Sequence, residues 1–431
     1  MVFSEEFVLE FFKKIEERIK EEKIIEREIK VKPMQGKAIS IIGPRRAGKT
    51  FYLFYEKRRY GGVYIDFENV AFRNVGEEDI IKIIILFEKY FSKDVNVVYL
   101  DEVQNLKNWE KVVRSLLDFG FKVFISGSSS KLLSKEIATQ LRGRSLSYLL
   151  LPFSFREFLK AREFPLRELY SLSEITRLKK LLKEYLDIGG FPEIVLKPEK
   201  EKIIKEYMDL AFFKDFVERH EIKSVEVART IFEYITRNFS NEISPSKLQN
   251  FIASALGIKT RTTIYEYLDK LQDTLFFFFI ERCDYSIYKK RQFPKKVYLC
   301  DLGLTKLFRF SEDLGKLMEN TVFLELLRKT NENPLREIYY FKTKEGYEVD
   351  FLIKEGLRIK QLIQVTHANS FDEIDKREIR ALLHAKELFK KHNPELLVIT
   401  WDYEDEKELS WFGKKGKIKF IPLWKWLLNV A

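Results

Sequence analysis

The sequence has few of the side chains that build disulfide frameworks or zinc sites. It contains two cysteines, Cys283 and Cys300, and four histidines among 431 residues. Two cysteines without a metal-type spacing do not form a disulfide framework, and scattered histidines do not complete a zinc site. We therefore interpret both cysteines as packed thiols.

Long apolar runs and an export signal are also lacking. The longest apolar candidate, residues 274–280 with its four phenylalanines, is far shorter than the roughly 18 residues of a membrane span. The N-terminal residues are acidic and amphipathic, without the basic region and small-residue cleavage site of an export signal. These absences predict a cytoplasmic protein with no membrane role.

Charge and composition limit the remaining classes. The net charge of +11 and the pI near 9.2 favour a polyanionic partner such as nucleic acid. A lysine-rich surface gives the same sum without such a partner, because the charge is spread along the chain. Methionine and cysteine are scarce while lysine and glutamate are abundant, a bias reported for proteins that work at high temperature. The length predicts two to four domains.

The clearest motif is GPRRAGKT at residues 43–50, which follows an apolar run at 38–42 and precedes a helix-like stretch at 51–55. A strand, a glycine-delimited turn and a helix N-terminus direct backbone N–H groups at one anion, as in a P-loop. Lys49 can reach the β- and γ-phosphates, and the Thr50 hydroxyl can ligate Mg²⁺. The alternative is a chance match in an ordinary strand-turn-helix. The predicted nucleotide-binding residues are Gly43, Pro44, Arg45, Arg46, Ala47, Gly48, Lys49, Thr50 and Phe51.

A second stretch argues against a chance match. The apolar residues 96–100 end in Asp101 and Glu102, which is the pattern of a Walker B strand. Asp101 is predicted to hold Mg²⁺, and Glu102 to polarise the attacking water as a general base. Two solvated acids at a strand end are common singly, but here they would have to coincide with the P-loop motif. The pair therefore predicts hydrolysis of ATP.

Apolar strands alternate with helical segments through the first 150 residues. Strands are predicted at 62–66 and 122–126 and helices at 77–91 and 109–119, which together give a doubly wound parallel α/β sheet. Residues 4–30 carry Phe7, Phe11, Ile15 and Ile19 at helical spacing, so we predict one amphipathic helix that packs on the flank of this domain.

Polar side chains after the strand at 122–126 are candidates for sensing the γ-phosphate. The element order resembles that of P-loop ATPases, in which this strand lies between the two Walker strands. Ser126 or Ser128 is then the predicted sensor, although a serine-rich turn that caps a helix from Lys131 explains the same residues. Arg142 or Arg144 could act in trans as an arginine finger in a homo-oligomer. Cations also favour helix C-termini, so that role stays open.

Two further motifs identify a family. LPFSFREFL at 151–159 and YLDIGGFPEIV at 185–195, together with GPRRAGKT, VVYLDE and SGSSSKLLS in this order, resemble a prokaryotic group of AAA-type ATPases that is common in archaea. The resemblance implies ATP and Mg²⁺ as ligands and a poorly characterised C-terminal domain. The helical residues 161–221, interrupted at Gly189 and Gly190, are predicted to form a small lid over the nucleotide.

Residues 222–310 have the pattern of a winged helix. Helices are predicted at 228–237, 246–256 and 260–275, the second capped by Ser244 and Pro245, and extended pieces follow at 276–283 and 296–299. The third helix could enter the major groove, and the hairpin tip could contact phosphates. The alternative is a winged helix that contacts only protein. The candidate DNA-binding residues are Arg261, Thr262, Thr263, Tyr265, Lys289, Lys290, Arg291, Lys295 and Lys296.

Residues 311–431 show an α-β-β-β-α-β order and resemble a restriction-endonuclease-like domain. That resemblance implies Mg²⁺ held by Glu325, Asp350 and Gln364, followed by a lysine where this chain has Thr366. A neutral threonine does not replace the lysine, and an amide oxygen is a weaker metal ligand than a carboxylate. Lys342 or Lys354 could substitute, but we favour a degenerate fold kept for DNA or protein binding.

The complete prediction is a chain of five segments. They are an N-terminal helix (1–30), a P-loop AAA-type ATPase domain (31–160), a helical lid (161–221), a winged helix (222–310) and a nuclease-like domain (311–431). We expect the protein to hydrolyse Mg-ATP and to couple hydrolysis to its C-terminal modules, acting on DNA. The alternative is an ATP-gated scaffold for protein complexes with slow hydrolysis.

Overall fold

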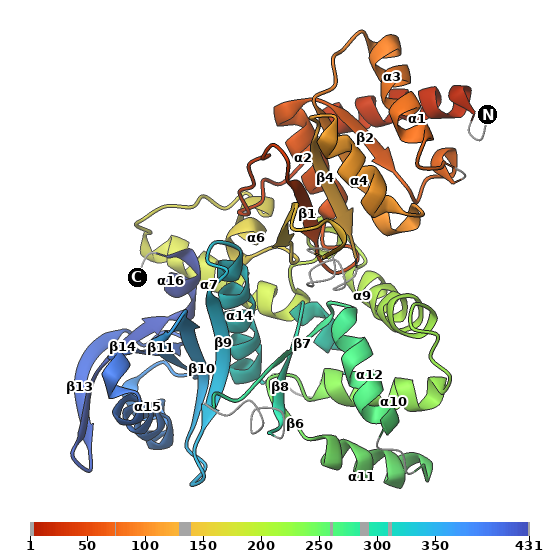
Figure 1. The fold of residues 1–431 in the computed structure, drawn as a ribbon. Coiled ribbons are helices and arrows are strands. Elements are labelled where there is room, and N and C mark those ends of the chain that lie inside the picture. Colours follow the sequence, from red (N-terminus) through yellow and green to blue (C-terminus); the bar gives the residue numbers. More distant parts are fainter. Residues whose placement is uncertain are drawn as a thin grey trace. The chain divides into compact units, whose positions relative to one another are not determined.

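The computed structural model describes residues 4–73, 75–128, 139–258, 262–284, 293–308 and 313–429. The chain forms two compact units, Met1–Pro152 and Phe153–Ala431 (Figure 1). In the described residues the first unit contains one sheet and the second unit two, and each unit has its own hydrophobic core.

The first unit contains a parallel sheet with the order β2-β3-β4-β1-β5 in the described residues. Strand β4 pairs in parallel with both β1 and β3, so it lies between the two Walker strands as expected. The buried runs of β1 and β3 are typical of central parallel strands, which are covered on both faces. The strands are β1 (Ala38–Ile42), β2 (Val63–Asp66), β3 (Val97–Asp101), β4 (Lys122–Gly127) and β5 (Ser145–Leu149).

Four α-helices accompany this sheet in the described residues. They are α1 (Glu5–Glu21), α2 (Lys49–Tyr60), α3 (Asp79–Phe91) and α4 (Trp109–Asp118). Helix α1 lies on the flank of the P-loop domain, where Phe12 packs edge-on against Phe87 of α3 with ring centroids 5.0 Å apart. Ile15 and Ile19 of α1 join the core that also contains Ile39 and Ile41 of β1. Ile15 and Ile19 of the predicted stripe therefore serve the domain core, whereas Phe7 is exposed and Val8 is buried instead.

Helix α1 is shorter than the sequence indicated, and the prediction of one helix over 4–30 is corrected here. The helix ends at Glu21, and residues 22–33 contain no helix. Its C-terminal carbonyls are bound by the guanidinium of Arg58, which donates to Ile19 O at 2.6 Å and to Glu22 O at 2.6 Å. A side chain from α2 thus satisfies carbonyls that a longer helix would have bonded internally.

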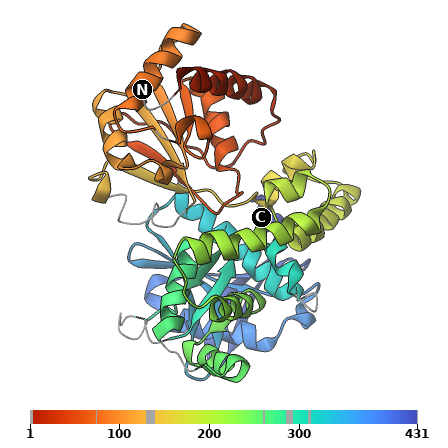
Figure 2. The same ribbon diagram turned by 90° about the vertical axis from the view of Figure 1, so that its right-hand side faces the viewer.

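The second unit begins with five helical segments in its described residues. The last two follow each other without a break and form one long run (Figure 2). The five segments are α6 (Phe155–Ala161), α7 (Leu172–Ile188), α8 (Pro192–Leu196), α9 (Lys200–Asp209) and the π-helix η4 (Leu210–Glu218). Capping boxes at Ser154 and Ser171 begin α6 and α7. Helix α7 ends at Ile188 with Gly189 as its C-cap, where the sequence predicted an interruption.

The glycine pair after α7 is explained by a buried carboxylate. Gly189 has φ +75°, and a Cβ there would overlap the side chain of Asp301. Asp301 accepts hydrogen bonds from Gly190 N at 2.6 Å and Gly303 N at 2.9 Å, and burial raises its pKa to about 7. The motif YLDIGGFPEIV therefore acts here as a packing joint between α7 and the turn that follows β8.

The described residues between 225 and 299 form a helical bundle and a small antiparallel sheet. The helices are α10 (Val225–Arg237), α11 (Pro245–Leu256) and α12 (Thr262–Asp273), and the strands are β6 (Glu242–Ile243), β7 (Phe277–Ile280) and β8 (Lys295–Leu299). Strand β8 lies between β6 and β7. Ser244 caps α11 through Lys247 N with Pro245 at the first turn, as predicted. Phe276 and Phe277 are buried, while Phe278 and Phe279 are half-buried.

The C-terminal part contains a mixed sheet with the order β13-β14-β12-β11-β10-β9. Its elements are α14 (Leu314–Arg328), β9 (Arg336–Lys342), β10 (Glu348–Glu355), β11 (Arg358–Val365), α15 (Lys376–Leu388), β12 (Glu395–Thr400), β13 (Asp405–Trp411), β14 (Lys414–Pro422) and α16 (Leu423–Leu428). The last three were not predicted. Asp375 caps α15 through Arg377 N, so that helix begins at Lys376.

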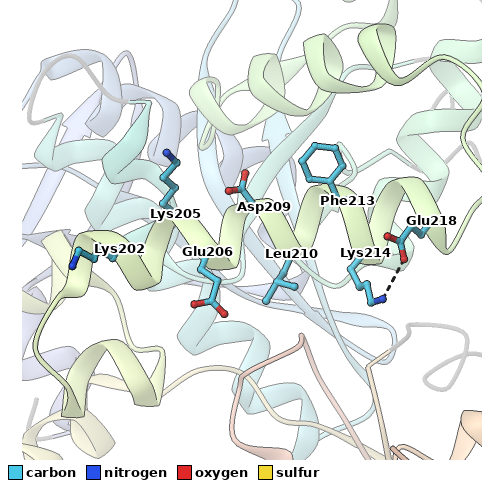
Figure 3. Close-up of a pocket in the computed structure, with 8 residues that line it drawn as sticks. All are labelled: Lys202, Lys205, Glu206, Asp209, Leu210, Phe213, Lys214 and Glu218. Atoms are coloured by element: carbon cyan, nitrogen blue, oxygen red, sulfur yellow. Dashed lines mark ion pairs between the residues drawn. The ribbon is translucent and has the colours of Figure 1, made fainter.

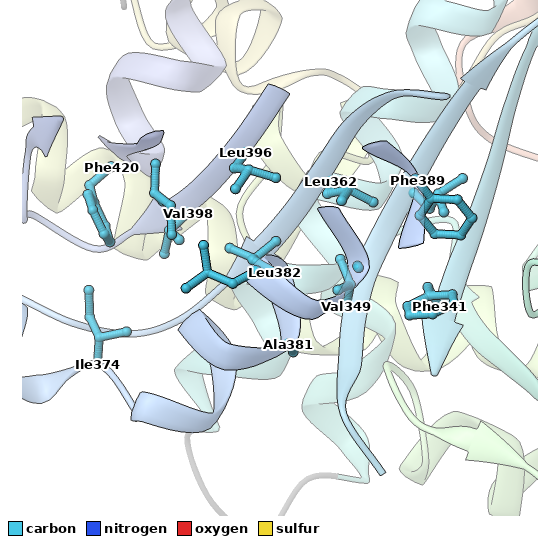
Figure 4. Packing of buried hydrophobic residues seen from close by; sticks show 14 of the residues in the cluster. Phe341, Val349, Leu362, Ile374, Ala381, Leu382, Phe389, Leu396, Val398 and Phe420 are labelled. Atoms are coloured by element: carbon cyan, nitrogen blue, oxygen red, sulfur yellow. The ribbon is translucent and has the colours of Figure 1, made fainter. Parts of the chain in front are cut away.

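The two faces of this sheet are covered by different helices. Leu382 of α15 packs with Leu352, Leu362 and Val398, and Figure 4 shows this cluster between the helix and the strands. Phe351, which neighbours Leu352 and so points to the other face, stacks with Phe323 of α14. Within the described residues, no helix is both long and apolar enough to cross a membrane.

Candidate nucleotide-binding site

The P-loop lies at the carboxyl end of β1, directly before α2. Arg46 and Gly48 have left-handed backbones with φ +68° and +96°, and a Cβ at Gly43 would overlap the carbonyl oxygen of Leu150. Gly48 occupies the N-cap of α2 and supplies no side-chain cap, so the first N–H groups of the helix face the loop without a competing side-chain acceptor. This is the geometry of an anion site.

Lys49 is held over the loop. Its ammonium donates to Gly43 O at 3.2 Å and to Pro44 O at 3.1 Å, and it lies 3.7 Å from Glu102 Oε1. The side chain is 4% exposed, so its charge is little screened by solvent. A buried cation beside helix N–H groups is suited to bind phosphate.

Asp101 at the end of β3 is the centre of a buried hydrogen-bond network. Its Oδ2 accepts from Thr50 Oγ1 at 2.7 Å and from Tyr64 OH at 2.6 Å, and its Oδ1 accepts from Ser126 Oγ. Burial, and then the charge of Glu102, raises the pKa of Asp101. The hydroxyl of Thr50 and this carboxylate are hard oxygen ligands of the kind that Mg²⁺ prefers.

Glu102 is oriented by an unusual backbone. It has φ +48°, a left-handed backbone that costs free energy for a residue with a Cβ. Its N–H donates to Ser126 Oγ at 3.1 Å, and its Oε2 accepts from Gln104 at 2.5 Å. Asp66, at the end of the adjacent strand β2, has its pKa raised to about 6 by burial. The predicted base is therefore fixed next to the predicted metal ligand.

The two candidate γ-phosphate sensors, Ser126 and Ser128, are both buried but differ in their contacts. Ser126 is buried at the end of β4 and contacts Asp101 directly. Ser128 is also buried, whereas the helix predicted from Lys131 lies outside the described residues. A side chain that contacts the carboxylate is placed to respond to the ligands of that carboxylate.

The candidate arginine fingers lie at the other end of the sheet. Arg144 precedes Ser145, which pairs with Ala38, the first residue of β1, so a strand length separates it from Gly43. Its guanidinium forms an ion pair with Asp118 at 2.5 Å. Within one chain it does not reach the P-loop, and only a finger in trans is compatible with this position.

Two residues that contact the site were not predicted from the sequence. Arg27, in the segment before β1, is buried and donates to Ala47 O at 2.9 Å and to Leu151 O at 2.5 Å. These two hydrogen bonds link the P-loop to the segment that follows β5. Tyr64 on β2 contacts Asp101. No local pattern marks either residue, because both contacts depend on which strands and segments become neighbours in the fold.

Tyr64 offers a specific test of this network. We expect Tyr64→Phe to raise the Mg²⁺ concentration needed for half-maximal ATP hydrolysis about 3- to 10-fold, because Asp101 loses a hydrogen bond of roughly 1 kcal/mol that orients it. The maximal rate should change less. The measurement is ATP turnover against Mg²⁺ at saturating ATP.

Tyr99→Phe is the matched control for Tyr64→Phe. Tyr99 lies on the neighbouring strand β3 and is equally buried, but its hydroxyl has no hydrogen-bond partner in the described residues. We expect it to leave the Mg²⁺ requirement unchanged. Equal behaviour of the two variants would assign Tyr64 to packing alone.

The nuclease-like residues do not assemble as the resemblance implied. Glu325 is 2% exposed and pairs with Arg156 at 2.5 Å and Arg328 at 3.5 Å. Asp350 instead pairs with Lys296, which also contacts Glu319 of α14. The helix carboxylate near Asp350 is thus Glu319, since six residues of helix place Glu325 about 120° away. The predicted Glu325–Asp350 grouping is wrong.

The remaining predicted residues of the second unit are scattered. Gln364 and Thr366 are buried at the end of β11 and just after it, Lys342 pairs with Glu242 and Glu348, and Lys354 pairs with Glu337. Both lysines are therefore held in ion pairs with glutamates. Among the described residues, no group of three or more His, Cys, Asp or Glu side chains is placed to hold a metal ion.

The candidate DNA-binding residues divide in the same way. Thr262 and Thr263 begin α12, and Tyr265 is 45% exposed on it. Lys296 is buried among carboxylates, so its predicted contact with phosphate is wrong. Lys295 lies 3.8 Å from Glu281. Arg261, Lys289, Lys290 and Arg291 lie outside the described residues.

One open pocket lies far along the sequence from the nucleotide motifs. It has a volume of about 500 Å³ and follows the α9–η4 run (Figure 3). Its lining residues are Lys202, Lys205, Glu206, Asp209, Leu210, Phe213, Lys214 and Glu218, with Lys214 paired to Glu218 at 3.3 Å. It contains no P-loop or Walker B residue, so it does not compete as the nucleotide site.

Comparisons with known proteins agree with the first unit and leave the second open. Residues 35–159 match a family described as an AAA domain, while 179–313 and 314–425 match domains of unknown function, DUF8612 and DUF4143. The uncharacterized protein MJ1544 of Methanocaldococcus jannaschii is 37% identical over 420 residues, covering 95% of this chain and 92% of that protein.

More distant similarities extend to bacteria and to a solved structure. An uncharacterized protein of Haemophilus influenzae is 26% identical over 402 residues, covering 90% of this chain and 94% of that protein. The Walker-type ATPase paby2304 of Pyrococcus abyssi is 16% identical, covering 72% of this chain and 96% of that chain, with a TM-score of 0.42.

Proposed function

The chain belongs to the same family as the M. jannaschii protein MJ1544 and carries a P-loop AAA domain, and from this premise we propose that it binds and hydrolyses Mg-ATP. The observation that carries the proposal is the convergence of Lys49, Thr50 and the Asp101-Glu102 pair at the carboxyl ends of β1 and β3. An ordinary strand-turn-helix needs no such convergence.

The roles follow from the contacts. Thr50 and Asp101 would hold Mg²⁺, which supplies charge neutralisation to the phosphates when bound. Lys49 and the first N–H groups of α2 bind the β- and γ-phosphates. Glu102 takes a proton from water as the water oxygen bonds to the γ-phosphorus, and the bond from that phosphorus to the bridging oxygen of ADP breaks. The products are ADP and phosphate.

We propose further that ATP turnover drives the C-terminal modules on DNA. The net charge of +11 and the three helices with a small antiparallel sheet, α10 to α12 and β6 to β8, support a winged-helix module that binds DNA. An ATP-gated protein scaffold is the second candidate. It is favoured by the burial of Lys296, which takes a candidate phosphate contact away from the surface, and by the pairing of Glu325 with arginines, which takes one expected residue from the nuclease-like site.

Steady-state phosphate release tests the first proposal. Wild-type protein should release phosphate from Mg-ATP, and Lys49→Ala protein from the same preparation should not. Equal release by both proteins would trace the activity to a contaminant and reject the proposal.

The proposal that the protein acts on DNA is tested separately. We expect duplex or branched DNA to stimulate turnover and labelled DNA to shift at low salt. Tight ATP binding with negligible turnover and no shift would instead support the scaffold.

A further inference from the structure

The second unit contains a buried lysine surrounded by carboxylates. Lys296 on β8 is 3% exposed, and its ammonium lies 2.7 Å from Glu348, 3.0 Å from Asp350 and 3.1 Å from Glu319. We call these four residues the Lys296 cluster. Its carboxylates come from β10 and α14, so the lysine joins three elements that are distant in the sequence.

We propose that the ammonium of Lys296 is the resident cation of this cluster, in the place where a metal-dependent nuclease fold would hold Mg²⁺, so that this domain binds no divalent ion there. The restriction-endonuclease resemblance implies a metal at Asp350. The residues around Asp350 do not fit a metal ion. This domain therefore departs from the resemblance in two ways: an ammonium takes the place of the metal, and the catalytic lysine is missing.

The stereochemistry favours an ammonium. A lysine ammonium has three donors and no acceptor, and the cluster offers one oxygen from each of three carboxylates at hydrogen-bond distance. Mg²⁺ requires about six oxygens at roughly 2.0–2.1 Å and usually keeps several waters. A buried ammonium in direct contact with all three carboxylates leaves no room for such a shell.

Two of the other carboxylate oxygens are already engaged, and one oxygen that contacts Lys296 has a second donor. Asp350 Oδ2 accepts from Val365 N at 3.0 Å, Glu319 Oε1 also accepts from Tyr298 OH at 2.7 Å, and Glu348 Oε2 pairs with Lys342 at 2.9 Å. Burial opposes the charge on Lys296, but the carboxylates outweigh it and hold its pKa well above the usual value. Burial raises the pKa of Glu319 to about 7 against the lowering effect of Lys296.

The position of Lys296 also gives it a mechanical role. Leu299, three residues further along β8, donates through its N–H to Asn320 Oδ1 at 2.9 Å and accepts from Asn320 Nδ2 at 3.0 Å. Together with the lysine, these bonds fasten the small antiparallel sheet to α14. The cluster is therefore a charged joint between the bundle of residues 225–299 and the C-terminal sheet.

Metal titration of the full chain tests the proposal directly. The protein carries Thr50→Ala, which removes the P-loop hydroxyl, and binding of Mn²⁺ is followed by electron paramagnetic resonance without nucleotide. We expect equal Mn²⁺ binding by this protein and by the same protein with Asp350→Asn. A site tighter than about 100 µM that Asp350→Asn removes would overturn the proposal, since Mg²⁺ and Mn²⁺ share oxygen ligands.

Removal of the lysine should open the site. On the same background, Lys296→Met is expected to lower Tm by more than about 5 °C, because it leaves buried carboxylates uncompensated. Mn²⁺ at 1 mM should then raise its Tm by at least about 2 °C and leave the parent unchanged. An unchanged Tm for Lys296→Met, or equal stabilisation of the parent by Mn²⁺, would contradict the proposal.

Lys342→Met is the matched control, since Lys342 pairs with the same Glu348 but is more exposed. It should lose little stability and gain no response to Mn²⁺. If Lys296→Met does not fold, Lys296→Met/Glu319→Gln removes one of the uncompensated charges and should recover folded protein. The comparison of the parent with Asp350→Asn decides the proposal without either variant.

Discussion

The Glu102→Gln variant is expected to hydrolyse ATP about 10²- to 10⁴-fold more slowly than the wild type, the range that a general base contributes. The amide keeps the shape of the side chain and can still contact Gln104, but it cannot take a proton from water. The measurement is kcat for phosphate release at saturating Mg-ATP.

Binding of ATP should survive this substitution. Glu102 lies 3.7 Å from Lys49, so a neutral side chain there removes one attraction and leaves the ammonium available to phosphate. Calorimetry should find a Kd for Mg-ATP within a few-fold of the wild-type value. Loss of binding in parallel with kcat would assign Glu102 to the structure of the loop.

Glu68→Gln is the matched control for Glu102→Gln. Glu68 follows β2 in the same unit, is half-exposed, and pairs with Arg45 of the P-loop at 3.3 Å. An exposed pair of this kind contributes little, so kcat should stay within about twofold. A large effect at Glu68 and none at Glu102 would contradict the proposed base.

The nucleotide site was predictable because its residues are adjacent in sequence or follow a strand. Gly43 to Thr50 form one turn, and Asp101 and Glu102 end one strand, so motif and fold coincide. Parallel strands bring their carboxyl ends to one edge, and that rule alone joins the P-loop to Asp101. The hydrogen bond from Thr50 to Asp101 is its result.

The rest depended on information that spacing does not contain. Arg27 and Tyr64 reach the site across neighbouring segments. On α14, Glu319 and Glu325 are both buried carboxylates, and the sequence does not say which helix face meets β10. The cationic partners decide which glutamate lies near β10: Glu319 pairs with Lys296, and Glu325 pairs with Arg156.

The pair of Arg156 and Glu325 leads to the second large prediction. Arg156→Met is expected to lower the free energy of unfolding by about 3–5 kcal/mol, the usual cost of breaking a buried ion pair by removing one partner. The carboxylate of Glu325 then keeps Arg328, at 3.5 Å, as its remaining ion-pair partner in the described part of the chain. The measurement is thermal unfolding by calorimetry, with a fall in Tm of roughly 2–4 °C per kcal/mol.

A double-mutant cycle separates the ion pair from the other contact of Arg156, its hydrogen bond to Leu427 O. Arg156→Met/Glu325→Leu loses that hydrogen bond too, but it also removes the buried carboxylate, and Arg328 still donates to Phe153 O at 3.3 Å. Apolar replacement of a buried pair is often neutral. The double variant should therefore be more stable than Arg156→Met alone. If the double variant is instead the less stable of the two, Glu325 contributes something other than this pair, and its structural assignment fails.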